Sequence, residues 1–284
     1  MLTTFTIRTA THLPRAFLHR RTMSTFQLDK TIFNPSLYKQ LTDVWLPNVD
    51  LRGEELDMSA MKRWFMASPD EREAFDGVCR DKFAHALEAI GPEQVPEPTA
   101  EPFLDEIANI AHKNDDAHAA WAALSLTLLL DQIPRNLYRT DAGLRKVYNH
   151  YDKISYALAQ RLLDPAYPAS RPDLHPQWRN SAAHRVWFYM PLMHSEDIEA
   201  HNTLDALVDD CAKEYEQLEG HKGSKMFLDG QIKAEKDHRD ILDKFGRYPH
   251  RNAALGRPSR EEEKKFLEEG GATFGVGPEK ESNA

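Results

Sequence analysis

The sequence predicts an all-α protein, and three observations carry that prediction. Apolar residues recur at helical spacing along most of the chain. Runs of alternating β-branched residues between turns, the pattern of strands, are missing from the sequence. Helix-start signals are frequent: an Asn34-Pro35 pair, and a capping box at residues 68–71 with proline in its first turn. Short turns between the expected helices predict antiparallel helix hairpins, arranged as a bundle or a short solenoid.

The expected helices follow one another in chain order. They run from Pro35 to about Trp45, between Ser68 and Gly91, and over residues 101–113, 115–131, about 141–163, 181–190, 195–219 and 226–245. A second capping box at Ser259–Glu262 opens a short last helix, which Gly270 closes. The stretch WAALSLTLLL (121–130) is apolar all round, which predicts that its helix lies at the centre of the core. No repeat recurs at a fixed period, so the sequence does not support consensus helical repeats.

Residues 29–270 are expected to form one all-α domain, with a disordered tail over 271–284. A domain boundary in the proline-rich stretch 164–177 is the alternative. A loop wrapped within one domain is preferred, because neither half carries a complete set of amphipathic helices.

The first 28 residues differ in composition from the rest of the chain. Residues 1–28 contain four arginines, seven threonines, one serine and no acidic residue. This composition is typical of a mitochondrial transit peptide and predicts delivery to the mitochondrial matrix. The alternative is translation from Met23, which would give a cytoplasmic protein, and use of both starts would give both locations.

Charge and composition exclude several functional classes. The formal net charge of -9 argues against nucleic acid or an anionic membrane as the main partner. No apolar run approaches the roughly 18 residues of a membrane helix. The two cysteines have no metal-site spacing and fit a reducing compartment. No nucleophile elbow, phosphate loop or dinucleotide fingerprint is present, so no cofactor is indicated.

Three polar clusters interrupt the apolar pattern, and the first is LLLDQIPRN (128–136). Asp131 closes the most apolar helix, where a carboxylate meets the unfavourable end of the helix dipole and needs a cation. Arg135 follows too closely in sequence to be its obvious partner, so Arg247 or Arg251 is expected to pair with it. A purely structural Asp–Arg pair is the alternative.

The second cluster is YMPLMHSEDIEAHN (189–202). Ser195 is expected to cap the next helix, with Glu196 and Asp197 in its first turn. The alternative is a divalent metal site, because His194, Asp197 and His201 share one face if helical geometry extends back to residue 194.

The third cluster, HRDILDKFGRYPHRNAALGR (238–257), mixes basic and aromatic residues. His238 shares a face with apolar residues and is expected to point inward. Gly246 is expected to end the helix. Arginine, histidine and asparagine then follow on irregular backbone, where they can surround a carboxylate or phosphate. The alternative is that these side chains satisfy the loop's own carbonyls.

Together these motifs resemble the bacterial and fungal family called domain of unknown function 924, and the chain looks like a fungal-type member. The matching motifs are KRWF (62–65), LLLDQIPRNLYR (128–139), WFYMPLMHSED (187–197), HRDILDKFGRYPHRNAALGR (238–257) and EEEKKFLEEG (261–270). The resemblance covers about residues 35–275 and implies an all-α, tetratricopeptide-like fold. It implies no activity and no cofactor. His201 stands where the family usually has Gln, which weakens the metal hypothesis.

The family pattern carries over to a defined set of polar residues and glycines. They are Asp131, Gln132, Arg135, Asn136, His194, Ser195, Glu196, His238, Gly246, Arg247, His250, Arg251 and Asn252.

These residues predict a small-molecule enzyme or ligand-binding domain that acts on an anionic substrate by acid/base chemistry, such as hydrolysis or elimination. The expected catalytic residues are Asp131, His194, Glu196 and His250. The expected ligand-binding residues are Arg135, Asn136, His238, Arg247, Arg251 and Asn252. Two alternatives remain: an interaction scaffold that binds a protein partner, and a structural polar network without a ligand.

Overall fold

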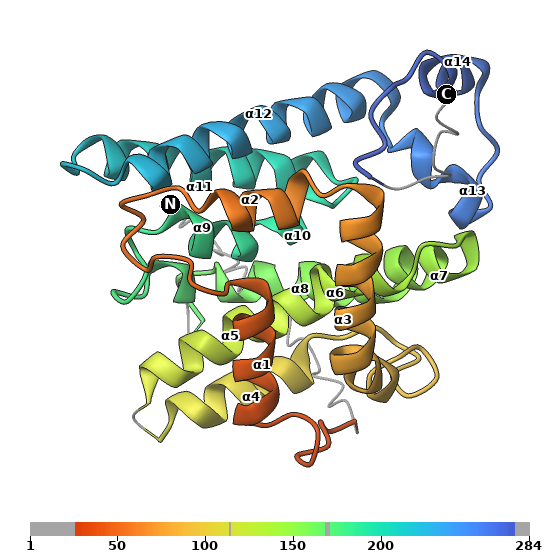
Figure 1. Ribbon diagram of the computed structural model, residues 1–284. Helices are drawn as coiled ribbons and strands as arrows, with labels where there is room; N and C mark the ends of the chain where they lie inside the picture. Colours follow the sequence, from red (N-terminus) through yellow and green to blue (C-terminus); the bar gives the residue numbers. More distant parts are fainter. Residues whose placement is uncertain (1–25, 114, 168–170, 276–284) are drawn as a thin grey trace, which may run out of the picture.

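Helices form all the regular secondary structure in the part of the chain that the computed structural model describes, residues 26–113, 115–167 and 171–275 (Figure 1). The all-α prediction is confirmed for these residues. Nearly all of the leader expected over residues 1–28, and positions 276–284 of the expected tail, lie outside the described residues. No helix among the described residues is long and apolar enough to span a membrane.

The helices have the following bounds. The longer ones are α1 (Pro35–Trp45), α2 (Met58–Phe65), α3 (Pro69–Ala89), α4 (Glu101–Ala111), α5 (Asp116–Asp131), α8 (Asp152–Leu162), α11 (Ile198–Glu216), α12 (Lys222–Phe245) and α14 (Glu261–Glu268). The shorter ones are α6 (Ile133–Leu137), α7 (Asp141–Lys146), α9 (Ala182–Arg185), α10 (Met190–Met193) and α13 (Asn252–Leu255). A π-helical turn covers Val147–Tyr151, and 3-10 turns cover Pro172–Leu174, Val186–Phe188 and Pro249–Arg251.

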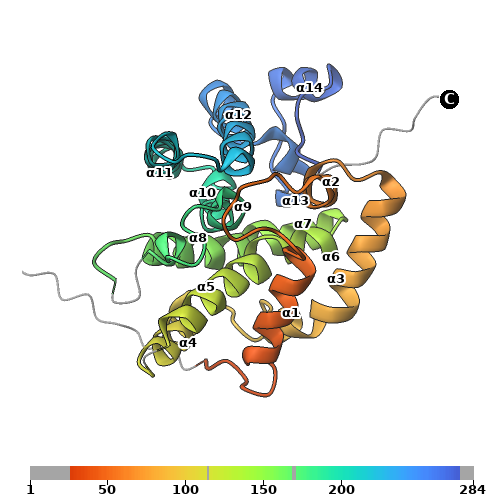
Figure 2. The same ribbon diagram turned by 60° about the vertical axis from the view of Figure 1, so that its left-hand side comes forward.

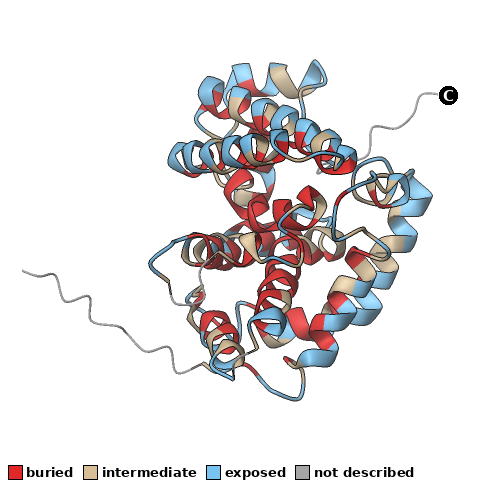
Figure 3. Cartoon of the chain, turned by 90° about the vertical axis from the view of Figure 1, so that its left-hand side faces the viewer, coloured by how far each residue is buried: buried red, intermediate tan, exposed pale blue. Residues whose placement is uncertain are grey.

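The helix α5 lies at the centre of the core, as its composition predicts. Every residue from Ala122 to Asp131 is buried, on all sides of the helix. It packs against α1, α4, α6 and α8 (Figure 2), and the buried residues gather around it (Figure 3). The side chains of one continuous core extend from Leu28 to Leu228.

Several predicted helix ends are confirmed. The Asn34 side chain accepts hydrogen bonds from two backbone N–H groups of the first turn of α1. Both hydrogen bonds of the capping box between Ser68 and Glu71 are present. Gly246 ends α12 with a φ of 68°, a left-handed conformation that glycine adopts without strain.

Two predicted helix starts are shifted along the chain. Asp197, not Ser195, caps α11 by accepting from the Glu199 N–H. At α14 the Glu263 carboxylate accepts from the Arg260 N–H at 2.8 Å, one residue later than expected. In each case the neighbouring residue takes up the capping geometry, and the element itself is unchanged.

Two predicted helices are divided, and one helix was not predicted. The segment 141–163 passes from α7 through the π-helical turn into α8, and the segment 181–190 consists of α9, a 3-10 turn and the start of α10. The short helix α2, capped by Asp57, was not expected. Its residues Trp64 and Phe65 pack against Phe227 of α12, with 5.9 and 6.3 Å between ring centroids.

Candidate functional site

A pocket of about 600 Å³ lies where α2, α3, α6, α10 and α12 meet. Its walls also include the ends of α1 and α5, and the chain segment that follows α14. The lining residues are Trp45, Met61, Arg63, Trp64, Phe65, Met66, Ala67, Arg72, Phe75, Gln132, Arg135, Asn136, Arg139, Trp187, Met190, Met193, His194, Gly230, Gln231, Ala234, His238, Phe274 and Gly275. The size suits a small organic molecule.

One side of the pocket is aromatic. The ring of Trp187 lies edge-on to Trp45 at 5.3 Å and to Trp64 at 5.0 Å between centroids. Phe65 stacks on Trp187 at 6.3 Å, and Phe75 lies 5.7 Å from Trp45. This wall offers flat apolar surfaces to the body of a ligand.

The charges that line the pocket are all positive. Arg63, Arg72, Arg135 and Arg139 belong to the lining, which contains no aspartate or glutamate. Arg139 binds Asp76 through two hydrogen bonds, so its charge is neutralised. Within the described part of the chain, Arg63 and Arg72 form no ion pair. Two arginines therefore remain to attract an anion in a protein whose net charge is -9.

A histidine–aspartate pair forms the polar end of the pocket. The Nδ1 atom of His194, which lines the pocket, lies 2.9 Å from Oδ1 of the fully buried Asp131. The Gln132 side chain donates to the other carboxylate oxygen of Asp131 at 2.7 Å. A carboxylate at Nδ1 fixes the imidazole as the tautomer with its proton on that atom. Nε2 of His194 is then free to accept a proton.

The electrostatics of this pair favour a neutral histidine beside an ionised aspartate. Burial, followed by the positive charge of Arg135, lowers the pKa of His194 below its ordinary value. Burial alone would raise the pKa of Asp131, but His194, Arg135 and the hydrogen bond from Gln132 outweigh it and lower that pKa. A neutral imidazole held by a carboxylate is the arrangement that a general base requires.

Arg135 is the arginine partner of Asp131, and the expectation of Arg247 or Arg251 is wrong. The Nη2 atom of Arg135 lies 3.5 Å from Asp131 and 2.8 Å from Oδ1 of Asp152. The chain continues from α5 into α6 almost without a break, so Arg135 sits one helical turn after Asp131 and reaches back to it. The short i,i+4 separation therefore allows Arg135 to pair with Asp131.

Arg251 approaches the same network from the other side. Its guanidinium lies 3.9 Å from Oδ2 of Asp152 and between two rings, 4.6 Å from Tyr148 and 4.7 Å from Tyr248. Sequence reasoning missed Asp152 and Tyr148. Tyr148 lies in the π-helical turn Val147–Tyr151 and Asp152 directly follows it. Such turns are frequent at functional sites, and the i,i+4 spacing of the two residues is the sequence feature that could have identified them.

Buried polar atoms without a hydrogen-bond partner among the described residues are concentrated around this pocket. Four belong to pocket-lining residues and are donors only: Trp45 Nε1, Trp187 Nε1, Arg63 Nη1 and Arg135 Nε. Others belong to the network behind His194: Tyr148 Oη, Asp152 Oδ2, His250 Nδ1 and Arg251 Nε. The walls around the pocket therefore contain buried donors that lack acceptors among the described residues.

His238 lies close to His194, whereas His250 stacks on Tyr248, and neither forms a hydrogen bond or ion pair with Asp131 among the described residues. The ring of His238 lies 6.5 Å from that of His194, and its Nδ1 atom lies 2.8 Å from the Ala234 carbonyl oxygen. Burial lowers the pKa of His238 to about 3 and that of His250 to about 2. Both rings are neutral at physiological pH. Asn136 lines the pocket and donates to Asp76 at 2.7 Å.

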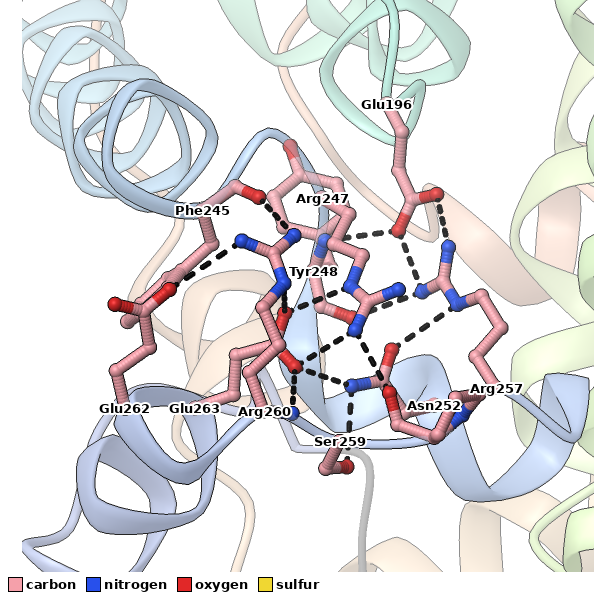
Figure 4. A network of polar contacts seen from close by, with 11 residues as sticks. Glu196, Phe245, Arg247, Tyr248, Asn252, Arg257, Ser259, Arg260, Glu262 and Glu263 are labelled. Atoms are coloured by element: carbon pink, nitrogen blue, oxygen red, sulfur yellow. Dashed lines mark hydrogen bonds and ion pairs between the residues drawn. The ribbon is translucent and has the colours of Figure 1, made fainter.

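Three of the predicted site residues belong to a second cluster, which does not line the pocket (Figure 4). Arg247 donates to both oxygens of the buried Glu263 at 2.7 and 2.8 Å, and Asn252 donates to the same carboxylate at 3.1 Å. Glu196 accepts two hydrogen bonds from Arg257 and one from the Tyr248 N–H. These groups satisfy one another and tie α14 to the end of α12, so the geometry does not place Glu196, Arg247 or Asn252 in the pocket.

The geometry also separates the three residues considered as metal ligands. His201 is buried between Glu235, 2.6 Å from its Nδ1, and the Ser195 carbonyl oxygen, 3.0 Å from its Nε2. Asp197 caps α11, and His194 pairs with Asp131. Among the described residues, no group of three or more His, Cys, Asp or Glu side chains is arranged to hold a metal ion.

Comparisons with known proteins give a family and a fold. A family model described as "Bacterial protein of unknown function (DUF924)" matches residues 41–271, a range that contains all three polar clusters. No curated protein matches the chain. Among solved structures, a protein of unknown function from Agrobacterium tumefaciens is 27% identical over 85% of this chain and 100% of its own, with a TM-score of 0.54.

Proposed function

Because the chain belongs to the DUF924 family, whose function is unknown, we propose a function from its own pocket: it binds a small organic anion and performs acid/base chemistry on it. The family indicated by the motifs is confirmed, but membership of this family does not indicate which activity the chain has. The class of reaction proposed is hydrolysis or elimination, in which a positioned base accepts a proton.

The observation that carries this proposal is the His194–Asp131 pair at the end of the pocket. Asp131 orients the ring and stabilises the imidazolium that forms when His194 takes a proton. The lowered pKa of His194 keeps the ring neutral and ready to act as a base at physiological pH. His194 is thus proposed as the general base, Asp131 as its positioning residue, and Arg135 as the group that keeps Asp131 ionised.

The anionic character of the ligand is proposed from the arginines and the buried donors of the lining. Arg63 and Arg72 carry charges without ion-pair partners in the described part of the chain. The indole N–H groups of Trp45 and Trp187 are buried in the aromatic wall without partners among the described residues. A carboxylate or phosphate supplies the acceptors that such a set of donors favours.

Two alternatives expected from the sequence receive less support. An interaction scaffold would place its polar residues along an open groove, whereas here Arg135, His194 and His238 line one pocket. A purely structural network accounts well for the second cluster around Glu263, where each charge has a partner. It does not account for Arg63 and Arg72.

The proposal is tested with His194→Gln and Arg63→Gln, each measured for folding by circular dichroism and for thermal shifts with a panel of organic anions. We expect both variants to fold. His194→Gln should bind the same anions and lose turnover, whereas Arg63→Gln should bind them about tenfold more weakly. An Arg63→Gln variant with unchanged anion binding would contradict the proposal. Lys62→Gln, a neighbouring exposed residue paired with Glu71, is the control.

Finer assignments expected from the sequence are also proposals. We propose that the hairpins belong to the tetratricopeptide-like superfamily, that the chain is of the fungal type, and that its leader directs it to the mitochondrial matrix. The acid-free, arginine-containing composition of residues 1–28 supports the last point. A C-terminal fluorescent fusion found only in the cytosol would exclude it.

A further inference from the structure

The segment that follows α14 returns to the pocket instead of leaving the protein. Gly270 has a φ of 90°, and the Gly271 N–H donates to the Phe266 carbonyl at 2.8 Å. A Cβ atom on Gly271 would lie 2.5 Å from the Phe266 ring, so only glycine allows this close approach. The two glycines therefore direct residues 272–275 back to α12, where Phe274 and Gly275 line the pocket.

Phe274 stacks flat on His238. Their ring centroids lie 3.6 Å apart with 10° between the planes. Tyr248 lies edge-on to Phe274 at 6.2 Å, and His250 lies edge-on to it at 5.8 Å. The three rings of His238, Tyr248 and His250, called the ring box below, thus hold one flat aromatic side chain.

The ring box is fixed by contacts that do not involve the tail. Tyr248 donates through its hydroxyl group to the Met193 carbonyl at 3.0 Å, and His238 Nδ1 contacts the Ala234 carbonyl. His238 also lies edge-on to Tyr248 at 5.7 Å. His250 stacks on Tyr248 with 5.6 Å between the ring centroids. Tyr248 and His238 are therefore anchored to α10 and α12, and His250 is packed on Tyr248, by contacts that do not involve Phe274.

Phe274, by contrast, is held loosely. Residues 272–275 form no hydrogen bond with other described residues, and 37% of Phe274 remains exposed. Its φ of 52° is a left-handed conformation that costs a non-glycine residue energy. His250 Nδ1, a buried polar atom of the ring box, has no hydrogen-bond partner among the described residues. A ring with a polar substituent would suit this box better than Phe274 does.

We propose that the ring box is a binding subsite for a planar aromatic ring of the ligand, and that Phe274 occupies it as an internal substitute. This inference rests on the proposed function and narrows its substrate class to aromatic organic anions. His238, on which the ligand's ring would stack, is itself 6.5 Å from the ring of His194. An acidic side chain on the ligand's ring then extends into the arginine-lined part of the same pocket.

The experiment compares Phe274→Leu, which keeps bulk but removes the aromatic ring, with Phe274→Trp, which keeps a flat ring. The probes are 3-phenylpropionate and its saturated analogue 3-cyclohexylpropionate, titrated by calorimetry into the full chain. Phe274→Leu should bind 3-phenylpropionate about tenfold more tightly than the unmodified protein, the effect of one competing stacked ring. Phe274→Trp should not gain affinity. For 3-cyclohexylpropionate the gain should stay below about threefold.

Two further measurements separate this inference from the proposed function. Benzyl alcohol, a neutral ring, should bind Phe274→Leu more tightly than cyclohexylmethanol does. If benzyl alcohol does so while 3-phenylpropionate binds Phe274→Leu no more tightly than benzyl alcohol, the ring box is supported and the proposal of an anionic ligand is contradicted.

The opposite outcome is also defined. If the two acids bind with equal affinity, bind Arg63→Gln more weakly, and show no change in affinity for Phe274→Leu, the proposed function is supported and the ring box is overturned. Failure of every aromatic probe to bind Phe274→Leu also overturns the ring box.

Discussion

The Nδ1 atom of His194 lies 2.9 Å from Oδ1 of Asp131, although 63 residues separate them in the chain. Asp131 ends the most buried helix of the protein, and His194 ends the short helix α10. The same carboxylate is approached by Arg135, which also binds Asp152. One buried charge therefore organises side chains from three segments, and its removal is expected to affect both stability and chemistry.

Asp131→Asn should lower the free energy of unfolding by about 3 kcal/mol, because it removes one member of a buried charge network and leaves Arg135 undercompensated. It should also lower the pKa of His194 further, since the aspartate charge favours the imidazolium. Urea denaturation and NMR titration of the histidines measure the two effects. Asp43→Asn, in an exposed pair with Lys39, is the control and should change stability little. Equal effects of the two variants would contradict the role given to Asp131.

Stability should fall as the pH is lowered below 6.5. The pKa of His238 is lowered to about 3 and that of His250 to about 2, so between these values and 6.5 the unfolded chain binds protons that the folded protein does not. Each group then contributes a loss of up to about 1.4 kcal/mol per pH unit. His201 has the opposite sign: its pKa is raised, so its contribution is present below 6.5 and is lost as the pH rises through the folded pKa. Urea midpoints from pH 7 to 4.5 measure the slope, which His250→Gln should flatten. If the urea midpoint of His250→Gln depends on pH as steeply as that of the unmodified protein, His250 is not neutral in the folded protein.

Glu263→Gln should weaken the fold without altering ligand binding. The pKa of Glu263 is lowered to about 2 by the hydrogen bonds from Arg247, so its stabilising effect is present at neutral pH and is lost as the pH falls through that value. We expect a lower urea midpoint and an unchanged affinity for 3-phenylpropionate. The exposed neighbour Glu262, changed to Gln, is the control. Weaker binding at unchanged stability would place the second cluster in the functional site.

Two glycines in helices should respond oppositely to alanine. Gly77 lies inside α3 with nothing near the added Cβ atom, so Gly77→Ala should stabilise the protein by about 0.5–1 kcal/mol. Gly223 lies at the start of α12, where a Cβ atom would be 2.2 Å from the Glu55 backbone. Gly223→Ala should therefore destabilise the protein by more than about 2 kcal/mol. Thermal and urea denaturation of the pair measure the difference, and two stabilised variants would mean that the loop at Glu55 moves freely.

The fold could be predicted largely from the sequence because its signals are local. Helical spacing, Asn34, the capping box at Ser68 and the glycine at 246 each act within one turn of a helix. The site could be predicted only in part, because it depends on contacts between distant segments. Asp131 and His194 were recognised as unusual, but their direct pairing requires α5 and α10 to meet.

Several hydrogen-bond and ion-pair partners that the sequence did not predict lie in other segments of the chain, which a local sequence pattern does not reveal. Arg247 and Asn252 have the donors that an anion site needs, yet they bind Glu263, which the sequence presents as one more acid of a charged helix. Asp152 was overlooked because its own sequence neighbourhood does not show that Arg135 and Arg251 approach it from other segments. Phe274 belongs to a stretch that the composition predicts to be disordered. In the structure, the turn at Gly270 directs this stretch back to the pocket, where Phe274 lines the wall.

The position of Asp131 at the end of α5 has a consequence for local opening. Amides in α5 are surrounded on all sides by other helices, so their hydrogen exchange is expected to require the opening of the whole core. Residues 272–275, which form no hydrogen bond with other described residues, belong to the other extreme, and their amides are expected to exchange through small fluctuations. The pocket thus lies between α5, which is expected to open only with the whole core, and residues 272–275, which are expected to move away from the pocket in small local fluctuations.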